Sequence, residues 1–174
     1  RHIAHAELQA EARETEELVF HQDLLGHGVG IAEEKDGESL RGAHPLARTM
    51  AEQTGCDVLL CDEDPGEDDL RRAQAAAGAS TGILGATFAH IQCYKGDGVR
   101  LPERQVELWR ALSATGKLRA VLLFESPYAL SDLPADVPVV IGYGGDDFTL
   151  AAATEAVLGR RACPGKLPVT VERG

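Results

Sequence analysis

The sequence predicts an α/β fold: a three-layer α/β/α sandwich with a mostly parallel sheet. Two observations predict it. Residues 120–124 (AVLLF) and 137–142 (VPVVIG) are short runs that are apolar at nearly every position, which is typical of strands covered on both faces. Strand-like runs also alternate with helix-like segments along the chain, a pattern typical of parallel sheets flanked by helices.

The first part of the chain contains a predicted helix, a strand and a loop. Residues 1–17 are rich in Glu, Gln, Arg and Ala, and small or apolar residues recur on one face, so we expect a helix. Residues 18–25 (LVFHQDLL) predict the first strand. Residues 26–44 contain many glycines and charges and predict a long loop. The segment 26–30 (GHGVG) lacks the third glycine of a GxGxxG motif, so we favour a loop over a phosphate site.

A helix and a second strand follow. Residues 45–54 predict a helix with Pro45 in its first turn and Gly55 at its end. Residues 57–61 (DVLLC) form the next apolar run and predict a strand.

Residues 62–69 contain six acidic residues within eight positions. A calcium site is one interpretation, but the order of ligands in an EF-hand loop is missing. We interpret the segment as an exposed loop with acids gathered at a helix N-terminus, where the helix dipole favours them. The helix is expected over residues 67–77 and is expected to end at Gly78.

Residues 81–89 (TGILGATFA) predict the third strand, and residues 93–102 a polar loop. Residues 102–113 predict an amphipathic helix that ends at Gly116. Its buried stripe is expected to consist of Val106, Leu108, Trp109 and Leu112.

The two apolar runs named first then follow, separated by a short turn region over residues 128–136. Residues 148–158 predict the last helix, with Gly159 as its C-cap. Residues 167–171 (LPVTV) predict a final short strand at a sheet edge, because Pro168 cannot donate a ladder hydrogen bond. The resulting order of strands and helices is flavodoxin-like in appearance.

The bulk composition excludes several classes of protein. The chain has 174 residues, 44% hydrophobic and 26% charged, which fits one ordinary globular domain. A net charge of −11 argues against a basic nucleic-acid surface. The sequence contains no apolar run of about 20 residues, so we expect no membrane segment. Its four cysteines form no CxxC pair and are expected as free thiols; we expect no metal and no cofactor.

A set of short motifs lies at the ends of the predicted strands: S-P-Y, L-x-x-L-P, Y-G and G-K-L-P-V-T-V. Their order and spacing resemble the C-terminal domain of glycoside hydrolase family 3, and most closely its β-N-acetylhexosaminidase (NagZ-like) branch. The resemblance spans residues 83–171. The matching residues are Ser126, Pro127, Tyr128, Leu130, Leu133, Pro134, Tyr143, Gly144, Gly159, Gly165, Lys166, Leu167, Pro168, Val169 and Thr170.

The resemblance implies a division of the chain and a partner. Residues 1–17 would be a linker helix, and residues 18–174 a non-catalytic C-terminal domain that packs on an N-terminal TIM barrel of the same protein. In that family the barrel provides the carboxylate nucleophile and, in this branch, a His–Asp acid/base. None of those motifs occurs here, so no catalytic residue is assigned and the chain alone is expected to be inactive.

Glu125 is one exception that the family suggests. In β-glucosidase branches the second domain supplies an acid/base glutamate, and Glu125 follows a comparable strand. The motifs here resemble the other branch, however, so we interpret Glu125 as a strand-end glutamate. Ala129 also stands where the family frequently has Asp, which suggests a divergent edge.

Ligands of open α/β sheets bind beyond the carboxyl ends of the strands. Tyr128, Tyr143 and His90 follow three predicted strands and are the candidate substrate-binding residues. The tyrosine rings could stack on the apolar face of an N-acetylglucosamine-containing sugar; packing between turns is the alternative.

The sequence leaves three functions open. The first is the non-catalytic domain of an enzyme that hydrolyses terminal β-N-acetylhexosamine residues. The second is a stand-alone carbohydrate- or protein-binding module. The third is a small α/β enzyme, which the lack of a phosphate loop or a nucleophile motif makes the weakest. The resemblance favours the bacterial cytoplasm, with export as the alternative.

Overall fold

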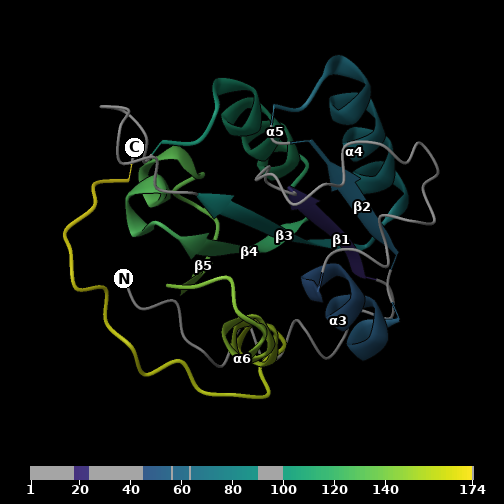
Figure 1. Cartoon of the computed structure of the whole chain (residues 1–174). Helices are drawn as coiled ribbons and strands as arrows, with labels where there is room; N and C mark the ends of the chain where they lie inside the picture. The colour runs from purple at the N-terminus through teal and green to yellow at the C-terminus, as the bar shows by residue number, and fades with distance from the viewer. Residues whose placement is uncertain (1–17, 24–44, 56, 63, 90–99, 174) are drawn as a thin grey trace.

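A computed structural model describes residues 18–23, 45–55, 57–62, 64–89 and 100–173 (Figure 1). The helix expected over residues 1–17 and the loop over 26–44 lie outside the described residues. So do most of the loop expected over 93–102 and His90.

The described elements alternate between strands and helices, as the sequence predicts. In chain order they are β1 (Leu18–Asp23), α3 (Pro45–Thr54), β2 (Val58–Cys61), α4 (Glu67–Ala79), β3 (Gly82–Ala89), α5 (Glu103–Ala114), β4 (Leu118–Glu125), the 3-10 helix η1 (Pro127–Asp132), β5 (Val139–Gly142) and α6 (Asp147–Val157).

The five strands form one sheet in the order β2-β1-β3-β4-β5, and every neighbouring pair is parallel. This is the flavodoxin-like order, in which the chain reverses its direction across the sheet between β1 and β3. The predicted fold class is therefore confirmed. Since all strands are parallel, their carboxyl ends lie at one edge of the sheet.

Helices cover both faces of the sheet, which gives three layers (Figure 1). On one face, α3 and α6 pack on alternate residues of β3 and β4. The cluster there contains Leu46, Met50, Leu84, Phe88, Leu122, Phe124 and Leu150. On the other face, α4, α5 and η1 pack on the intervening residues of β3 and β4. That cluster contains Ala73, Ile83, Leu108, Trp109, Val121, Leu123 and Leu130. This period of two is that of a strand buried on both faces.

Trp109 of α5 packs directly over the backbone of β3 at Gly85. A Cβ atom at Gly85 would lie 2.5 Å from Cζ3 and 2.8 Å from Cη2 of the Trp109 ring. Trp109 is itself fully buried. Only a glycine at this position leaves room for the edge of the indole ring against the middle of the sheet.

Three of the four glycines predicted to end helices do so. Gly55, Gly116 and Gly159 have φ values of 69°, 69° and 68°, in the left-handed region that favours glycine. The prediction for Gly78 is wrong, because α4 continues to Ala79. The Lys117 ammonium donates to the carbonyls of Ala77 (2.7 Å) and Gly78 (3.0 Å), so no glycine turn is needed to satisfy them.

The prediction of a strand over residues 167–171 is also wrong for this structure, where the segment lies outside the sheet. Pro168 has no amide to donate, and four apolar or small side chains offer little area to hold a short edge strand. The turn region predicted over 128–136 contains η1, which begins with Pro127 as its first residue.

The contact between Gly85 and Trp109 gives a stability prediction. Gly85→Ala is expected to lower the free energy of unfolding by about 1–3 kcal/mol, because the added methyl group must displace a buried indole. Urea denaturation followed by far-UV circular dichroism measures the change.

Gly78→Ala is the matched control. A Cβ at Gly78 meets nothing within 4 Å, and the residue lies inside α4. This variant is expected to raise stability by about 0.5–1 kcal/mol. Equal effects of the two substitutions would contradict the proposed packing.

Candidate functional site

The carboxyl ends of β3, β4 and β5 bring several polar and aromatic residues to one edge of the sheet. Ala89, the last residue of β3, pairs with Glu125, the last residue of β4. On the other side of β4, Phe124 pairs with Gly142, the last residue of β5. The segments that follow β4 and β5 therefore begin side by side.

Glu125 has a left-handed backbone conformation, with φ of 72°, and no other described non-glycine residue has a positive φ. A non-glycine residue pays about 1–2 kcal/mol for this conformation. The chain turns here from β4 directly into η1, and the next residue, Ser126, is fully buried. The sharp turn holds the half-buried Glu125 side chain at the carboxyl edge.

The segment after β5 approaches Glu125 closely. A Cβ atom on the exposed Gly145 would lie 3.5 Å from Oε1 of Glu125 and 3.8 Å from the Phe88 ring. Phe88 in turn stacks on Phe124, with ring centroids 4.7 Å apart. The Glu125 carboxyl group and the Phe88 ring therefore both lie close to the turn at Gly145.

Asp146 is the N-cap of α6, and both oxygens of its carboxylate accept hydrogen bonds from the start of this helix. Its Oδ1 accepts hydrogen bonds from the amides of Phe148 and Thr149, both at 3.1 Å. Its Oδ2 accepts one from the Thr149 hydroxyl at 2.7 Å. The hydroxyl of Thr149, and then its amide, hold the pKa of Asp146 below its ordinary value. Asp146 thus stabilises α6.

The structure places two of the three candidate substrate-binding residues. Tyr128 lies on η1 and is 48% exposed, and Tyr143 directly follows β5 and is 56% exposed. Both belong to the carboxyl edge, although no contact between their rings is recorded among the described residues. His90, the third candidate, lies outside the described residues.

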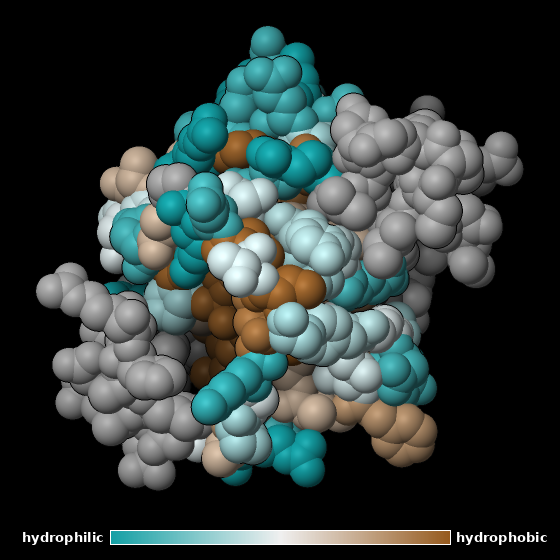
Figure 2. All heavy atoms as spheres, turned by 90° about the vertical axis from the view of Figure 1, so that its left-hand side faces the viewer, coloured by the Kyte–Doolittle hydropathy of each residue, from teal (hydrophilic) through white to brown (hydrophobic). Residues whose placement is uncertain are grey.

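Other exposed apolar side chains belong to neighbouring elements. Phe148 at the start of α6 is 88% exposed, and Leu167 of the C-terminal segment is 37% exposed. Figure 2 faces the side of the molecule where η1, β5 and the C-terminal segment lie, and it shows apolar side chains gathered in a hollow. This side of the molecule therefore exposes apolar surface as well as polar surface.

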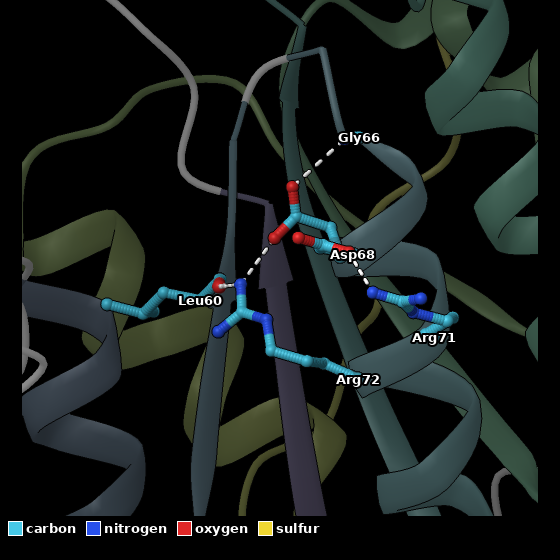
Figure 3. Close-up of polar contacts among 6 residues, drawn as sticks. Leu60, Gly66, Asp68, Arg71 and Arg72 are labelled. Atoms are coloured by element: carbon cyan, nitrogen blue, oxygen red, sulfur yellow. Dashed lines mark hydrogen bonds and ion pairs between the residues drawn. The ribbon is translucent and has the colours of Figure 1, made fainter.

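Two acidic residues in the first turn of α4, Asp68 and Asp69, form structural contacts (Figure 3). Asp69 accepts a hydrogen bond from the Gly66 amide at 3.0 Å and forms an ion pair with Arg72. Arg72 also donates to the Leu60 carbonyl at 3.2 Å, and its hydrogen bond to Asp69 raises its pKa. Asp68 pairs with Arg71. Asp69 therefore caps α4, and Arg72 joins α4 to β2.

Within the described ranges, no group of three or more His, Cys, Asp or Glu side chains is arranged to hold a metal ion. In the same part of the chain, no helix has the length and apolar character needed to cross a membrane. Cys61 is buried in β2 and Cys163 is exposed in the C-terminal segment. The other two cysteines lie outside the described residues.

The carboxylates of the described edge lie in different surroundings. A retaining glycosidase needs two carboxylates about 5 Å apart, one of them a nucleophile. At this edge, Asp146 caps α6, and Oε1 of Glu125 lies close to the turn at Gly145. One carboxylate and two aromatic rings can orient a sugar or line a rim.

The residues of this edge differ in how well the sequence predicts their positions. Both tyrosines were found because they follow apolar runs. The D-D-F-T sequence at residues 146–149 carries an N-cap signal at Asp146, one residue before the helix begins. The backbone of Glu125 gave no signal, because positive φ values are expected at Gly, Asn or Asp.

The fold is similar to part of a solved structure, a glycoside hydrolase family 3 β-N-acetylglucosaminidase from Paenibacillus sp. str. FPU-7. The TM-score is 0.61 at 17% sequence identity, over 87% of this chain and 26% of that one. The chain thus spans about a quarter of the length of that enzyme. At this identity the similarity shows a shared fold.

A 3-dehydroquinate dehydratase-like protein from Bifidobacterium longum aligns with a TM-score of 0.38 and 14% identity, over 82% of this chain and 94% of that one. That score is too low to support an argument about fold or function. No protein-family model and no curated protein matches the chain.

The strained backbone of Glu125 gives a prediction that separates strain from side-chain loss. Glu125→Gly and Glu125→Ala both remove the carboxylate, but only glycine adopts a φ of 72° without strain. The glycine variant is expected to be more stable than the alanine variant by about 1 kcal/mol. Urea denaturation of both variants measures the difference, and a more stable alanine variant would disprove it.

The cap at Asp146 gives a pH-dependent prediction. Because its pKa is lowered in the folded state, its stabilisation is complete above the ordinary value of 3.8. The stabilisation is lost as the pH falls through the lowered value. Asp146→Asn keeps an acceptor for the two amides but cannot titrate. The stability difference between wild type and this variant is expected to shrink from about pH 7 to about pH 3.

Thermal unfolding across that pH range provides the measurement. Asp146→Ala, which removes both the charge and the acceptor, is expected to be the least stable of the three proteins at neutral pH. A difference between wild type and Asp146→Asn that stays constant with pH would contradict the assignment.

Proposed function

We propose that this chain is the non-catalytic C-terminal domain of a glycoside hydrolase family 3 β-N-acetylglucosaminidase. In this proposal an N-terminal TIM barrel of the same protein hydrolyses terminal β-N-acetylhexosamine residues. The domain packs on that barrel, stabilises it, and presents its carboxyl edge to the rim of the active site.

The observation that best supports the proposal is the similarity of fold to one quarter of such an enzyme. The motifs from S-P-Y at residues 126–128 to G-K-L-P-V-T-V at residues 165–171 add support of a different kind. The edge itself agrees with a supporting role, since the described residues there include exposed aromatic side chains and the half-buried Glu125.

Tyr128 and Tyr143 would serve as the substrate-contacting residues of this domain, together with His90. An exposed ring on each of two adjacent strand ends can stack on the apolar face of an N-acetylglucosamine unit that extends from the barrel. Glu125 ends β4, the strand that leads to Tyr128, and could accept hydrogen bonds from sugar hydroxyl groups.

The native gene product tests the proposal directly. An immunoblot of source cells against this chain is expected to show a band several times larger than 18.5 kDa. The protein in that band is expected to hydrolyse a chromogenic β-N-acetylglucosaminide, and the 174-residue chain alone is expected to be inactive. A native band near 18.5 kDa would reject the proposal. Titration calorimetry with N-acetylglucosamine and chitobiose would then test a stand-alone binding module.

The two tyrosines give a kinetic prediction for the native enzyme. Tyr128→Ala and Tyr143→Ala are each expected to raise KM by roughly two- to tenfold, the loss of an aromatic contact of about 0.5–1.5 kcal/mol. Phe148→Ala is the matched control, because it removes an exposed ring from the neighbouring helix α6. An equal KM change in all three variants would exclude a specific role for the tyrosines.

A further inference from the structure

The helix η1, which carries Tyr128, begins at an unfavourable turn. The chain enters it through Glu125, whose φ of 72° is costly for a residue with a side chain. The next residue, Ser126, is fully buried, and its hydroxyl has no hydrogen-bond partner among the described residues. A buried hydroxyl without a partner also costs free energy. Two local penalties therefore stand at the entry to η1.

The hydrogen bonds of η1 contribute little to holding it. The helix spans six residues, Pro127–Asp132, whereas 3-10 helices rarely exceed three or four because their hydrogen bonds are poorly aligned. The Leu133 amide donates to the Leu130 carbonyl at 3.4 Å, a long bond that closes the last turn. Contacts with other elements must therefore keep η1 in place.

Apolar packing provides one such contact. Ala129, Leu130 and Leu133 belong to the buried cluster that η1 shares with α5. Hydrophobic packing is not directional, so it keeps η1 against the sheet without fixing its rotation. The direction of the exposed side of η1 therefore depends on a polar contact.

Asp132 makes that contact at the end of η1. Its side chain is only 2% exposed. Its Oδ2 accepts a hydrogen bond from the Leu101 amide at 2.9 Å, and its Oδ1 pairs with the guanidinium of Arg100. Arg100 and Leu101 come just before α5, which begins at Glu103. A buried carboxylate therefore ties η1 to the start of α5.

The support that α5 offers is firm, because this helix is fixed on the sheet. Leu108, Trp109 and Leu112 are fully buried, and the Trp109 ring packs over Gly85. Hydrogen bonds to a charged group are stronger than neutral ones, and the burial of Asp132 keeps competing water away. The contact is therefore strong enough to oppose the local penalties of η1.

We propose that Asp132 is a positioning residue of the carboxyl edge: its buried carboxylate holds η1 against the strain at Glu125 and thereby fixes where Tyr128 stands. Tyr128 lies on the same short helix and is 48% exposed. When the contact of Asp132 is broken, η1 turns, Glu125 relaxes, and the Tyr128 ring loses its fixed direction. The role of Tyr128 toward a sugar rests on the proposed function, whereas the hold of Asp132 on η1 does not.

Hydrogen exchange of the 174-residue chain, followed by NMR, tests the contact. The Leu101 amide lies outside the described helices and strands, so its protection depends on Asp132. Asp132→Ala is expected to raise exchange at Leu101 by roughly tenfold or more. The amide signal of Tyr128 is expected to shift, while that of Tyr143, which follows β5, stays in place.

Asp136→Ala is the matched control. Asp136 lies in the turn after η1 and accepts a hydrogen bond from the Ser113 hydroxyl of α5 at 3.1 Å, but this contact is exposed. The control is expected to leave Leu101 exchange and the Tyr128 signal unchanged. Equal effects of the two variants, or an unchanged Tyr128 signal in folded Asp132→Ala, would overturn the proposal.

A milder variant covers the case in which Asp132→Ala does not fold. Asp132→Asn keeps an acceptor for the Leu101 amide but loses the charge that pairs with Arg100. It is expected to show the same changes at Leu101 and Tyr128 with smaller amplitude. Their absence in this variant would also reject the proposal.

Two variants at Glu125 test whether release of η1 relieves the strained turn. Glu125→Gly and Glu125→Ala both remove the carboxylate, but only glycine adopts this φ without strain. Exchange at the Leu133 amide reports the opening of η1. It is expected to be about fivefold slower in the glycine variant, a ratio that corresponds to about 1 kcal/mol. Equal rates would contradict the proposal.

The native enzyme of the proposed function adds a kinetic measurement. Asp132→Ala is expected to raise KM by roughly two- to tenfold, as Tyr128→Ala does, and to leave kcat nearly unchanged. Because Asp132 acts through Tyr128, the double variant is expected to have a KM no higher than that of Tyr128→Ala alone. Additive effects would contradict the proposal. If the native protein has no barrel, the proposed function fails, and the exchange measurements still decide the role of Asp132.

Discussion

Strands β3 and β4 are buried on both faces, and the rest of the structure depends on this constraint. All eight residues of β3 are buried, so its backbone groups must pair with strands on both sides and its side chains with helices above and below. A helix that connects two parallel strands lets those strands pair in the sheet and covers the side chains on one face of it. The same constraint explains Gly85, because a full side chain there would leave no room for the indole that closes the α5 layer.

Because helices cover the middle of the sheet, a ligand can reach the sheet only at its edges. Ligand-facing residues can stand only where strands end, and the turn at Glu125 shows how tightly that margin is built. Its left-handed backbone lets β4 pass into η1 within one residue, while the glycines after β5 let the neighbouring turn come close. The strained backbone of Glu125 and the small glycines of the neighbouring turn are typical of a site whose geometry is fixed before a ligand binds.

Much of the fold could be predicted because apolar runs and helix-ending glycines act locally. Gly55, Gly116 and Gly159 each stand at a helix end with positive φ, as their positions indicated. Gly78 did not, because Lys117, far along the chain, satisfies the carbonyls that a glycine turn would otherwise satisfy. The positions of Tyr128 and Tyr143 followed from the strands, but the conformation of Glu125 arises from tertiary packing, and no local pattern reports it.

The layer formed by α3 and α6 joins the two ends of the described chain. Leu46 and Met50 share one cluster with Leu150 and Val157, and Arg160 binds Gln53 beside them. Contacts so distant in sequence form late, after the cost of closing a long loop. During synthesis, the part of α3 that contacts α6 therefore stays uncovered until α6 has left the ribosome.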